Sequence, residues 1–173
     1  MTGRDLSLWL RPEPAAAAEL DAVIGRLAAV HGTASFPAHL TVLAGLDREP
    51  EVAAAALSEL AGVTSPVRVR FGETRCEAVW HRSLYLVATP DPALRRLAEQ
   101  AVRSFGATDL SAFEPHLSLQ YSQLPVADKL RLAAQVELPL PLAVHFDRLS
   151  LWQTPGSDAG RWRMVAERTL AAG

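Results

Sequence analysis

Two short motifs in the sequence pair a histidine with a hydroxyl group two residues later. They are His39-Leu40-Thr41 and His116-Leu117-Ser118, and each continues into further apolar residues. Residues i and i+2 of a β-strand point to the same face, so each motif would direct an imidazole and a hydroxyl to one side of a strand. Two such strands lying side by side would gather two histidines and two hydroxyls around one small volume.

These four side chains suit the opening of a cyclic phosphodiester. One histidine can take a proton from water while the other protonates the departing ribose oxygen, because imidazole titrates near neutral pH. The hydroxyls of Thr41 and Ser118 can donate hydrogen bonds to the phosphoryl oxygens, where negative charge builds up. The motifs therefore predict acid–base catalysis that needs no metal ion and no other cofactor.

Two other interpretations of the motifs have to be weighed. Paired histidines often bind metal ions, but neither motif has a cysteine or an acidic residue at ligand spacing, although Asp109 and Glu114 lie nearby in the sequence. A lone histidine or threonine on a strand is often simply packed there. The repetition of the whole pattern favours a catalytic pair.

The composition is that of an ordinary globular protein. Of the 173 residues, 49% are hydrophobic and 21% are charged, which is sufficient for a buried core. A formal net charge of -2 without basic runs argues against binding of a long nucleic acid and is compatible with a nucleotide-sized substrate. Cys76 is the single cysteine, so no internal disulfide can form.

The sequence shows no secretion signal and no apolar run long enough to span a membrane. We therefore expect a cytoplasmic monomer that makes no contact with a membrane.

Hydrophobic periodicity predicts the elements that must position the two motifs. We expect strands over 6–10, 38–46, 67–71, 76–80, 83–89, 115–122, 144–154 and 162–170, and helices over 14–30, 51–62, 91–105 and 126–137. Gly32 and Gly106 are placed to end the first and third helices, and Gly72 is placed to turn the chain.

The second half of this order echoes the first, which suggests an internal duplication. Each histidine motif lies on a strand that follows one helix and precedes another. We expect an α+β fold in which residues 1–173 form a single domain of two pseudosymmetric lobes. Each lobe would hold an antiparallel-rich sheet with outer helices, and the active-site groove would lie between the lobes.

The motifs and their surroundings resemble a known family. The pair of His-x-Thr/Ser motifs is similar to that of the two-histidine (2H) phosphoesterases. Trp9 in the first strand, Tyr121 after the second motif, and Trp152 and Trp162 near the end resemble the plant and yeast cyclic phosphodiesterases in particular. The resemblance extends over nearly the whole chain, in the same order and at similar spacing.

The resemblance implies hydrolysis of small cyclic phosphates in the groove, such as ADP-ribose 1'',2''-cyclic phosphate or nucleoside 2',3'-cyclic phosphates. It implies that His116 is the base for water and His39 the acid, with Trp9 and Tyr121 as further substrate contacts. Strand parity turns Tyr121 away from the face of His116 unless the strand ends near Gln120. His81, outside the motifs, is expected at the surface or in a loop.

Two alternatives to this function stay open from the sequence. The first is an enzyme acting on RNA ends, either a 2',3'-cyclic phosphodiesterase or a 2',5'-RNA ligase-like enzyme, which the net charge disfavours. The second is a module that binds a nucleotide without turning it over. Retention of both histidines and both hydroxyls favours the enzyme.

Overall fold

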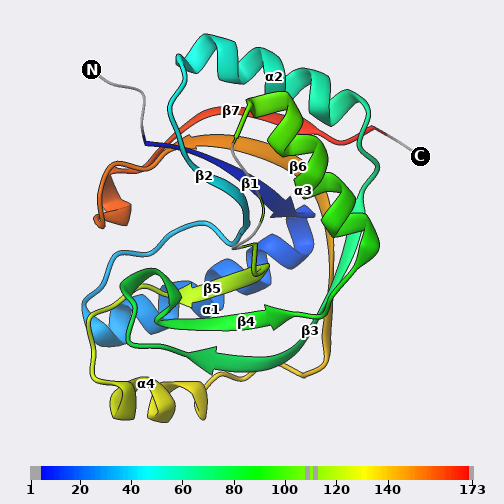
Figure 1. Cartoon of the computed structure of the whole chain (residues 1–173). Coiled ribbons are helices and arrows are strands. Elements are labelled where there is room, and N and C mark those ends of the chain that lie inside the picture. The colour runs from blue at the N-terminus through cyan, green and yellow to red at the C-terminus, as the bar shows by residue number, and fades with distance from the viewer. Residues whose placement is uncertain (1–4, 108–109, 111–112, 172–173) are drawn as a thin grey trace.

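A computed structural model describes residues 5–107, 110 and 113–171 (Figure 1). In chain order the strands are β1 (Leu6–Pro12), β2 (Leu40–Leu46), β3 (Val67–Cys76), β4 (Leu84–Ala88), β5 (His116–Gln120), β6 (Leu142–Gln153) and β7 (Arg163–Thr169). The α-helices are α1 (Pro14–His31), α2 (Pro50–Gly62), α3 (Pro92–Phe105) and α4 (Val126–Ala133). Short 3₁₀ turns cover Trp80–Arg82 and Ala159–Arg161. None of the helices in the described ranges is long and apolar enough to cross a membrane.

Local sequence signals place the helix ends. A proline opens each of α1, α2 and α3, at a position where the missing N–H has no partner in a helix anyway. The carboxylate of Asp91 caps α3 by accepting hydrogen bonds from two amides of its first turn, at 2.7 and 3.0 Å. Gly32 and Gly106 end α1 and α3 in the left-handed conformation, which confirms both predicted stops.

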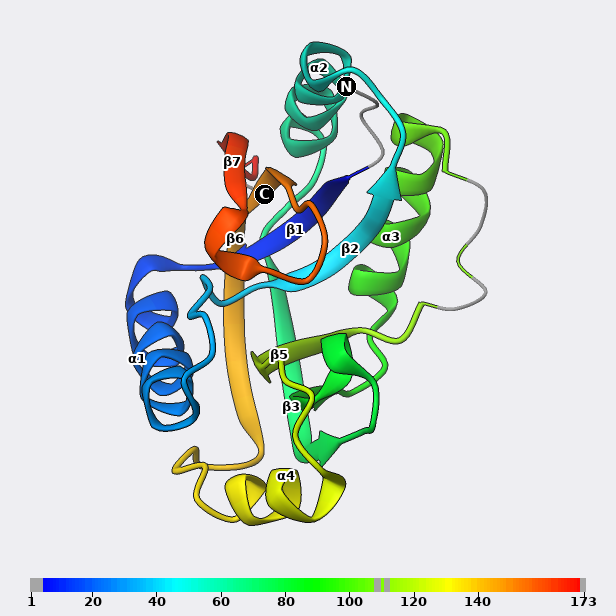
Figure 2. The ribbon, with the colours of Figure 1, turned by 90° about the vertical axis from the view of Figure 1, so that its left-hand side faces the viewer.

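The strands form one antiparallel sheet that closes on itself. β1 pairs with β2 and β6, β3 pairs with β4 and β6, and β4 pairs with β5. Strands β2 and β5 complete the circuit through a single residue pair, and β7 is added at the outer edge of β6. Figure 2 shows β6 running along both halves of the molecule, from β1 to β3.

The pairings repeat between the two halves of the chain. β1, β2 and β3 of the first half correspond to β4, β5 and β6 of the second. The β1–β2 pair then corresponds to β4–β5, and the β3–β4 pair corresponds to β6–β1. The β2–β5 and β3–β6 pairs each correspond to themselves. The helices follow the same correspondence, because α1 packs on β5 as α3 packs on β2, and α2 packs on β6 as α4 packs on β3.

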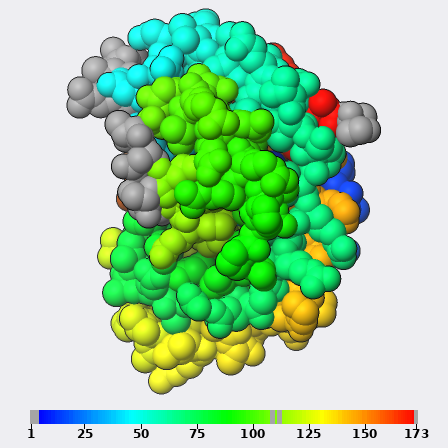
Figure 3. All heavy atoms as spheres, turned by 45° about the vertical axis from the view of Figure 1, so that its right-hand side comes forward, coloured from blue at the N-terminus to red at the C-terminus, as the bar shows by residue number. Residues whose placement is uncertain are grey.

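The expected α+β fold with two pseudosymmetric lobes is therefore present. One lobe contains β1, β2, β6 and β7 with α2 and α3, and the other contains β3, β4 and β5 with α1 and α4. In the space-filling view α2 covers one end of the molecule and α4 the other (Figure 3).

One hydrophobic core extends through both lobes. Phe71, Phe105 and Phe146 are among its largest fully buried side chains. Phe146 pairs with Val67 of β3 and with Pro12 of β1, so it lies where β6 passes from one lobe to the other. One continuous core, and not one for each lobe, follows from this arrangement.

The structure differs from the sequence prediction in the segment 67–80. The predicted turn at Gly72 is wrong, because β3 continues to Cys76 and the Phe71–Ala88 and Glu73–Val87 pairs enclose a bulge at the glycine. The strand predicted over 76–80 is also wrong. The amide of Glu77 donates to the carbonyl of Arg82 at 3.0 Å, so the chain closes a loop there instead of pairing with a neighbour.

The helix predicted over 126–137 ends at Ala133. The amides of Gln135 and Val136 bond to carbonyls three residues back, at 2.9 and 3.3 Å, so the last turn tightens and the helix does not continue. Pro139 and Pro141 follow shortly afterwards and could not have extended it.

Candidate active site

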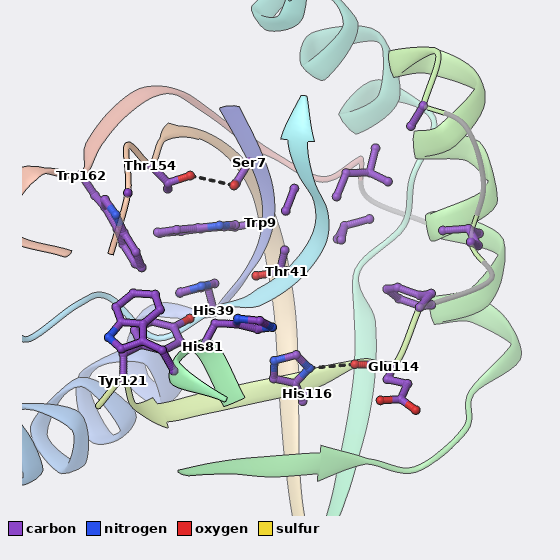
Figure 4. A pocket seen from close by; sticks show the side chains of 18 residues that line it. Ser7, Trp9, His39, Thr41, His81, Glu114, His116, Tyr121, Thr154 and Trp162 are labelled. Atoms are coloured by element: carbon purple, nitrogen blue, oxygen red, sulfur yellow. Dashed lines mark hydrogen bonds between the residues drawn. The ribbon is translucent and has the colours of Figure 1, made fainter. Parts of the chain in front are cut away.

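A cavity of about 580 Å³ lies between the two lobes. Ser7, Trp9 and Thr41 reach it from β1 and β2, and His116 reaches it from β5. Val42, Leu43 and Ala44 of β2 also line the cavity. The segments between the strands contribute Trp80 and the residues labelled in Figure 4 as His39, His81, Glu114, Tyr121, Thr154 and Trp162. The groove expected between the lobes is therefore present.

The contact between β2 and β5 brings the two histidine motifs together. The leucines of the motifs form the one residue pair that joins these strands. Extending the antiparallel register by one residue in each direction places Thr41 opposite His116 and His39 opposite Ser118. The four side chains of the motifs therefore share one face of the sheet, as the strand parity predicts.

The same local hydrogen bond holds both histidine rings. Nδ1 of His39 lies 2.7 Å from the carbonyl oxygen of Pro37, and Nδ1 of His116 lies 2.8 Å from the carbonyl oxygen of Glu114. A carbonyl oxygen can only accept, so in each ring Nδ1 carries a proton and donates it. Nε2 is the nitrogen left for proton transfer in both rings.

Burial keeps both histidines neutral. Loss of contact with water lowers the pKa of His39 to about 3, against the opposing effect of its hydrogen bond to Pro37. The pKa of His116 is also lowered, again mainly by burial. At neutral pH each Nε2 is therefore unprotonated and able to accept a proton.

Two charged side chains hold the peptide that precedes His39. The Arg11 guanidinium donates to the carbonyl oxygen of Ala38, and the Asp21 carboxylate accepts from the Ala38 amide at 2.6 Å. The indole of Trp9 stacks on the imidazole, with ring centroids 3.6 Å apart and planes 9° from parallel. His39 is thus fixed both through its backbone and across its ring.

A second charged network lies behind His116. The Arg82 guanidinium contacts the carboxylates of Glu77 and Glu114, each at 2.6 Å. The Tyr85 hydroxyl donates to Glu77 at 2.5 Å, and its ring meets the ring of His116 edge to face, with centroids 5.1 Å apart. Because the carbonyl of Glu114 accepts from His116, this network fixes the peptide that orients the imidazole.

The two hydroxyls of the motifs occupy different positions. Thr41 lines the cavity and is only partly buried. Ser118 is buried, with 3% of its surface exposed, and is not part of the cavity wall. Its Oγ donates to the carbonyl oxygen of His81 at 3.4 Å, which is a long hydrogen bond. Ser118 therefore shares the face of the motifs but lies below the surface of the cavity.

Trp9 lies in the cavity wall with both faces of its ring covered. His39 stacks on one side, and Trp152 stacks at 4.5 Å between centroids with the planes 19° apart. With 2% of its surface exposed, Trp9 supports the imidazole and offers no free face to a ligand.

Tyr121 reaches the cavity because β5 ends at Gln120, which frees it from the parity of the strand. Its ring lies between Phe36 and Trp80, with centroid distances of 4.3 and 4.7 Å. Burial raises the pKa of Tyr121 to about 12, so its hydroxyl stays protonated and can donate.

Several residues of the cavity wall were not identified from the sequence. His81 lies in the 3₁₀ turn, where it is exposed but lines the cavity, and Trp80 and Trp162 complete the aromatic wall. Ser7 and Thr154 share a hydrogen bond of 2.9 Å across the N-terminal and C-terminal segments. The run Trp80-His81-Arg82 contains none of the residues that favour turns, so no local signal pointed to this part of the wall.

The ionic character of the wall is unusual for a phosphate site. Among its described residues there is no lysine and no arginine, and Glu114 is the one carboxylate. Among all the residues that the structure describes, no three His, Cys, Asp or Glu side chains are grouped in a way that could hold a metal ion. Asp109, weighed above as a metal ligand, lies outside the described residues.

The fold and the paired motifs define a class of enzymes. The sequence profile of the 2'-5' RNA ligase superfamily matches residues 9–158. The chain belongs to this superfamily, which comprises phosphoesterases and RNA ligase-like enzymes of the two-histidine type. No curated protein sequence matches the chain.

Solved structures show the same fold. E. coli LigT in complex with 3'-AMP aligns with a TM-score of 0.63 at 20% identity, covering 97% of this chain and 98% of LigT. Its complex with ATP gives a TM-score of 0.62 at 18% identity over 97% and 98% of the two chains. The protein TT0787 of Thermus thermophilus gives 0.60 at 19% identity over 96% and 98%.

Proposed function

We propose that the chain hydrolyses small cyclic phosphates without a metal ion, with nucleoside 2',3'-cyclic phosphates as the preferred substrates. One observation carries the proposal: His39, directly before β2, and His116, at the start of β5, enter a single cavity, and each donates its Nδ1 proton to a carbonyl oxygen. Such a pair can supply a general base on one side of a phosphorus atom and a general acid on the other. The narrower likeness to plant and yeast cyclic phosphodiesterases is part of the same proposal.

The two histidines divide the proton transfers. Following the family resemblance, Nε2 of His116 takes a proton from water as the water oxygen bonds to phosphorus. The proton that His39 needs as the acid is taken up at its Nε2 when the anionic substrate binds beside the ring. The bond from phosphorus to one ribose oxygen then breaks, Nε2 of His39 gives that oxygen its proton, and His116 is left holding the proton taken from water. The Thr41 hydroxyl donates to a non-bridging oxygen. Ser118 can act as a second donor only after its hydroxyl turns from the carbonyl of His81 toward the substrate. The product is a nucleoside monophosphate.

The charge of the cavity favours a substrate with a single negative charge. A nucleoside 2',3'-cyclic phosphate carries one, whereas ADP-ribose 1'',2''-cyclic phosphate brings a diphosphate as well. No lysine or arginine among the described wall residues would neutralise the additional charge. An RNA end would likewise find no cationic side chains there for its backbone. LigT, which shares the fold, has been crystallised with 3'-AMP and also with ATP, so the preference for a small substrate is based on the wall of this chain and not on the fold.

The test is turnover of 2',3'-cyclic AMP by the purified protein in the presence of EDTA. His39→Asn and His116→Asn should each lower kcat by about 10²- to 10⁴-fold, the range for loss of a general acid or base. Thr41→Val should lower kcat by about 10²- to 10³-fold, the range for loss of an oxyanion donor. The kcat of Ser118→Ala shows whether the buried hydroxyl also contributes. His145→Asn is the control, because His145 is exposed on β6 and outside the cavity wall.

Wild-type rates in both variants of the motif histidines would overturn the proposal. Binding of 2',3'-cyclic AMP without any turnover would favour the nucleotide-binding module. An RNA oligomer ending in a cyclic phosphate that is cleaved far faster than the mononucleotide, at physiological salt, would favour the RNA-end enzyme.

A further inference from the structure

The cavity holds two stacks of aromatic rings that differ in what they leave uncovered. Trp9 has both faces covered, by His39 and Trp152. Tyr121 is likewise enclosed, between Phe36 and Trp80. These two residues, which the family resemblance selects as substrate contacts, therefore offer a ligand only their ring edges.

Trp80 is the outer member of the second stack. Tyr121 covers one face of its indole, with centroids 4.7 Å apart and planes 21° from parallel. Trp162 meets it edge to face at 6.4 Å and 88°. In contrast to Trp9, Trp80 is only partly buried. No other ring contact involves Trp80 among the described residues, and part of its surface stays accessible in the wall of the cavity.

Trp80 also lies where two cavities meet. It lines the cavity of the two histidines and, with Tyr121, a neighbouring cavity of about 360 Å³. The wall of this second cavity includes the polar side chains of Thr33, Ser122 and Gln123. A substrate whose phosphate lies at the histidines could therefore extend over Trp80 toward a second space.

The chemistry of the second cavity selects a neutral group. Among its described wall residues there is no lysine or arginine, and the one charged side chain is Asp158, which would repel a second phosphate. Hydroxyl and amide groups can pair with the edge of a nucleobase, and an indole face can stack on its plane. A flat, uncharged heterocycle fits both properties.

We propose that Trp80 is the stacking platform for the base of a nucleoside cyclic phosphate, with the edge of the base turned toward the second cavity. This inference rests on the proposed function, because the base can lie on Trp80 only if the phosphate of the same molecule lies at His39 and His116. It assigns base recognition to a residue of the 3₁₀ turn between β3 and β4.

The test compares a substrate that has a base with one that lacks it. The kcat/KM for 2',3'-cyclic AMP is divided by that for methyl riboside 2,3-cyclic phosphate, in wild type, Trp80→Leu and Trp80→Phe. Stacking of a base on an aromatic side chain predicts that Trp80→Leu lowers this ratio by about 5- to 150-fold. Trp80→Phe should retain most of it. Val79→Ala, at the exposed neighbouring residue, should keep the wild-type ratio.

An equal loss for both substrates in Trp80→Leu would show that Trp80 only supports the wall, and would overturn the inference. If the wild type turns over neither substrate, the proposed function fails first. The platform is then tested by binding alone, through the affinities for 3'-AMP and for ribose 3-phosphate in the same variants. Unchanged preference for 3'-AMP in Trp80→Leu would overturn the inference there too.

Discussion

Histidines are the groups of the described wall that can supply positive charge, and the two of the motifs are neutral when the cavity is empty. Burial lowers the pKa of His39 to about 3 and also lowers that of His116. No lysine or arginine of the described wall is available to hold an anion. An anion placed between the two rings favours a protonated imidazole, so its arrival should raise the pKa values that burial has lowered.

Anion binding should therefore take up a proton. Sulfate is a suitable probe because it does not titrate between pH 6 and 9, so any proton must go to the protein. We expect the Kd for sulfate to rise with pH, by up to about tenfold per pH unit above the pKa values of the free histidines. Titration calorimetry in buffers of different ionisation heat should show uptake approaching one proton per site at pH 7.5.

The variants separate this effect from titration elsewhere. His145→Asn should keep the wild-type pH dependence, whereas replacing both motif histidines by asparagine should remove it. A Kd for sulfate that is constant from pH 6 to 9 in the wild type would contradict the argument.

Helices and strands act on the chemistry by holding the peptides beside the histidines. β1 and α1 supply Arg11 and Asp21, which bind both polar groups of Ala38. The loop between β3 and β4 supplies Arg82, which binds the carboxylate of Glu114. An arginine and an acidic residue thus fix the peptide beside each imidazole.

Arg82 is accordingly expected to be a positioning residue. In Arg82→Met the Glu114 peptide loses its anchor, so kcat should fall by about 10- to 100-fold with little change in KM, because small misplacements of a catalytic group are costly. Steady-state kinetics on 2',3'-cyclic AMP measure both constants. Arg82→Lys should recover part of kcat, since a cation remains beside Glu77. Arg75→Met, at an exposed arginine of β3, is the matched control.

A rise in KM with unchanged kcat in Arg82→Met would instead make Arg82 a binding residue. Circular dichroism shows whether Arg82→Met is still folded. If it is not, the kinetics of Arg82→Lys, which keeps the charge and should remain folded, test the positioning role.

The sequence was sufficient to predict what depends on local periodicity. Alternation within a strand puts His39 with Thr41 and His116 with Ser118 on shared faces, and the register of β2 and β5 agrees. The sequence could not predict how deeply Ser118 is buried, because depth depends on the loop of His81 that covers it. Whether Gly72 would form a turn or a bulge was equally open, since the neighbouring strand decides it.

The supporting residues were beyond sequence reasoning for the same reason. Arg11 and Asp21 act on Ala38 from separate elements, and no spacing in the chain relates them. Trp80 lies in a segment whose alternation resembled a strand, yet a backbone contact from Glu77 to Arg82 folds it into a turn. Contacts between distant segments therefore account for most of what the sequence did not reveal.

At the level of the whole molecule, β6 pairs with strands of both lobes, so we expect the two lobes to unfold as one unit. Phe146 is fully buried and pairs with β1 on one side and β3 on the other. Phe146→Ala should lower the free energy of unfolding by about 3–5 kcal/mol, the usual cost of such a truncation in a core. This is a large part of the stability of a typical domain.

Urea unfolding measures this change. Tryptophan fluorescence and far-ultraviolet circular dichroism should give one coincident transition in both wild type and Phe146→Ala. Two separate transitions would show that the lobes unfold independently, and would contradict the role given to β6. Val165→Ala, at an exposed residue of β7, should change the free energy of unfolding far less.

The closed circuit of strands also affects how the chain is made. β1 leaves the ribosome well before its partner β6 is made, because Leu6 pairs with the distant Gln153. Until β6 has been synthesised, the long edge of β1 has only β2 beside it, and its leucines lack their final neighbours. Such distant pairings fold slowly and leave apolar edges exposed during translation. The nascent protein should therefore depend on chaperones more than its length suggests.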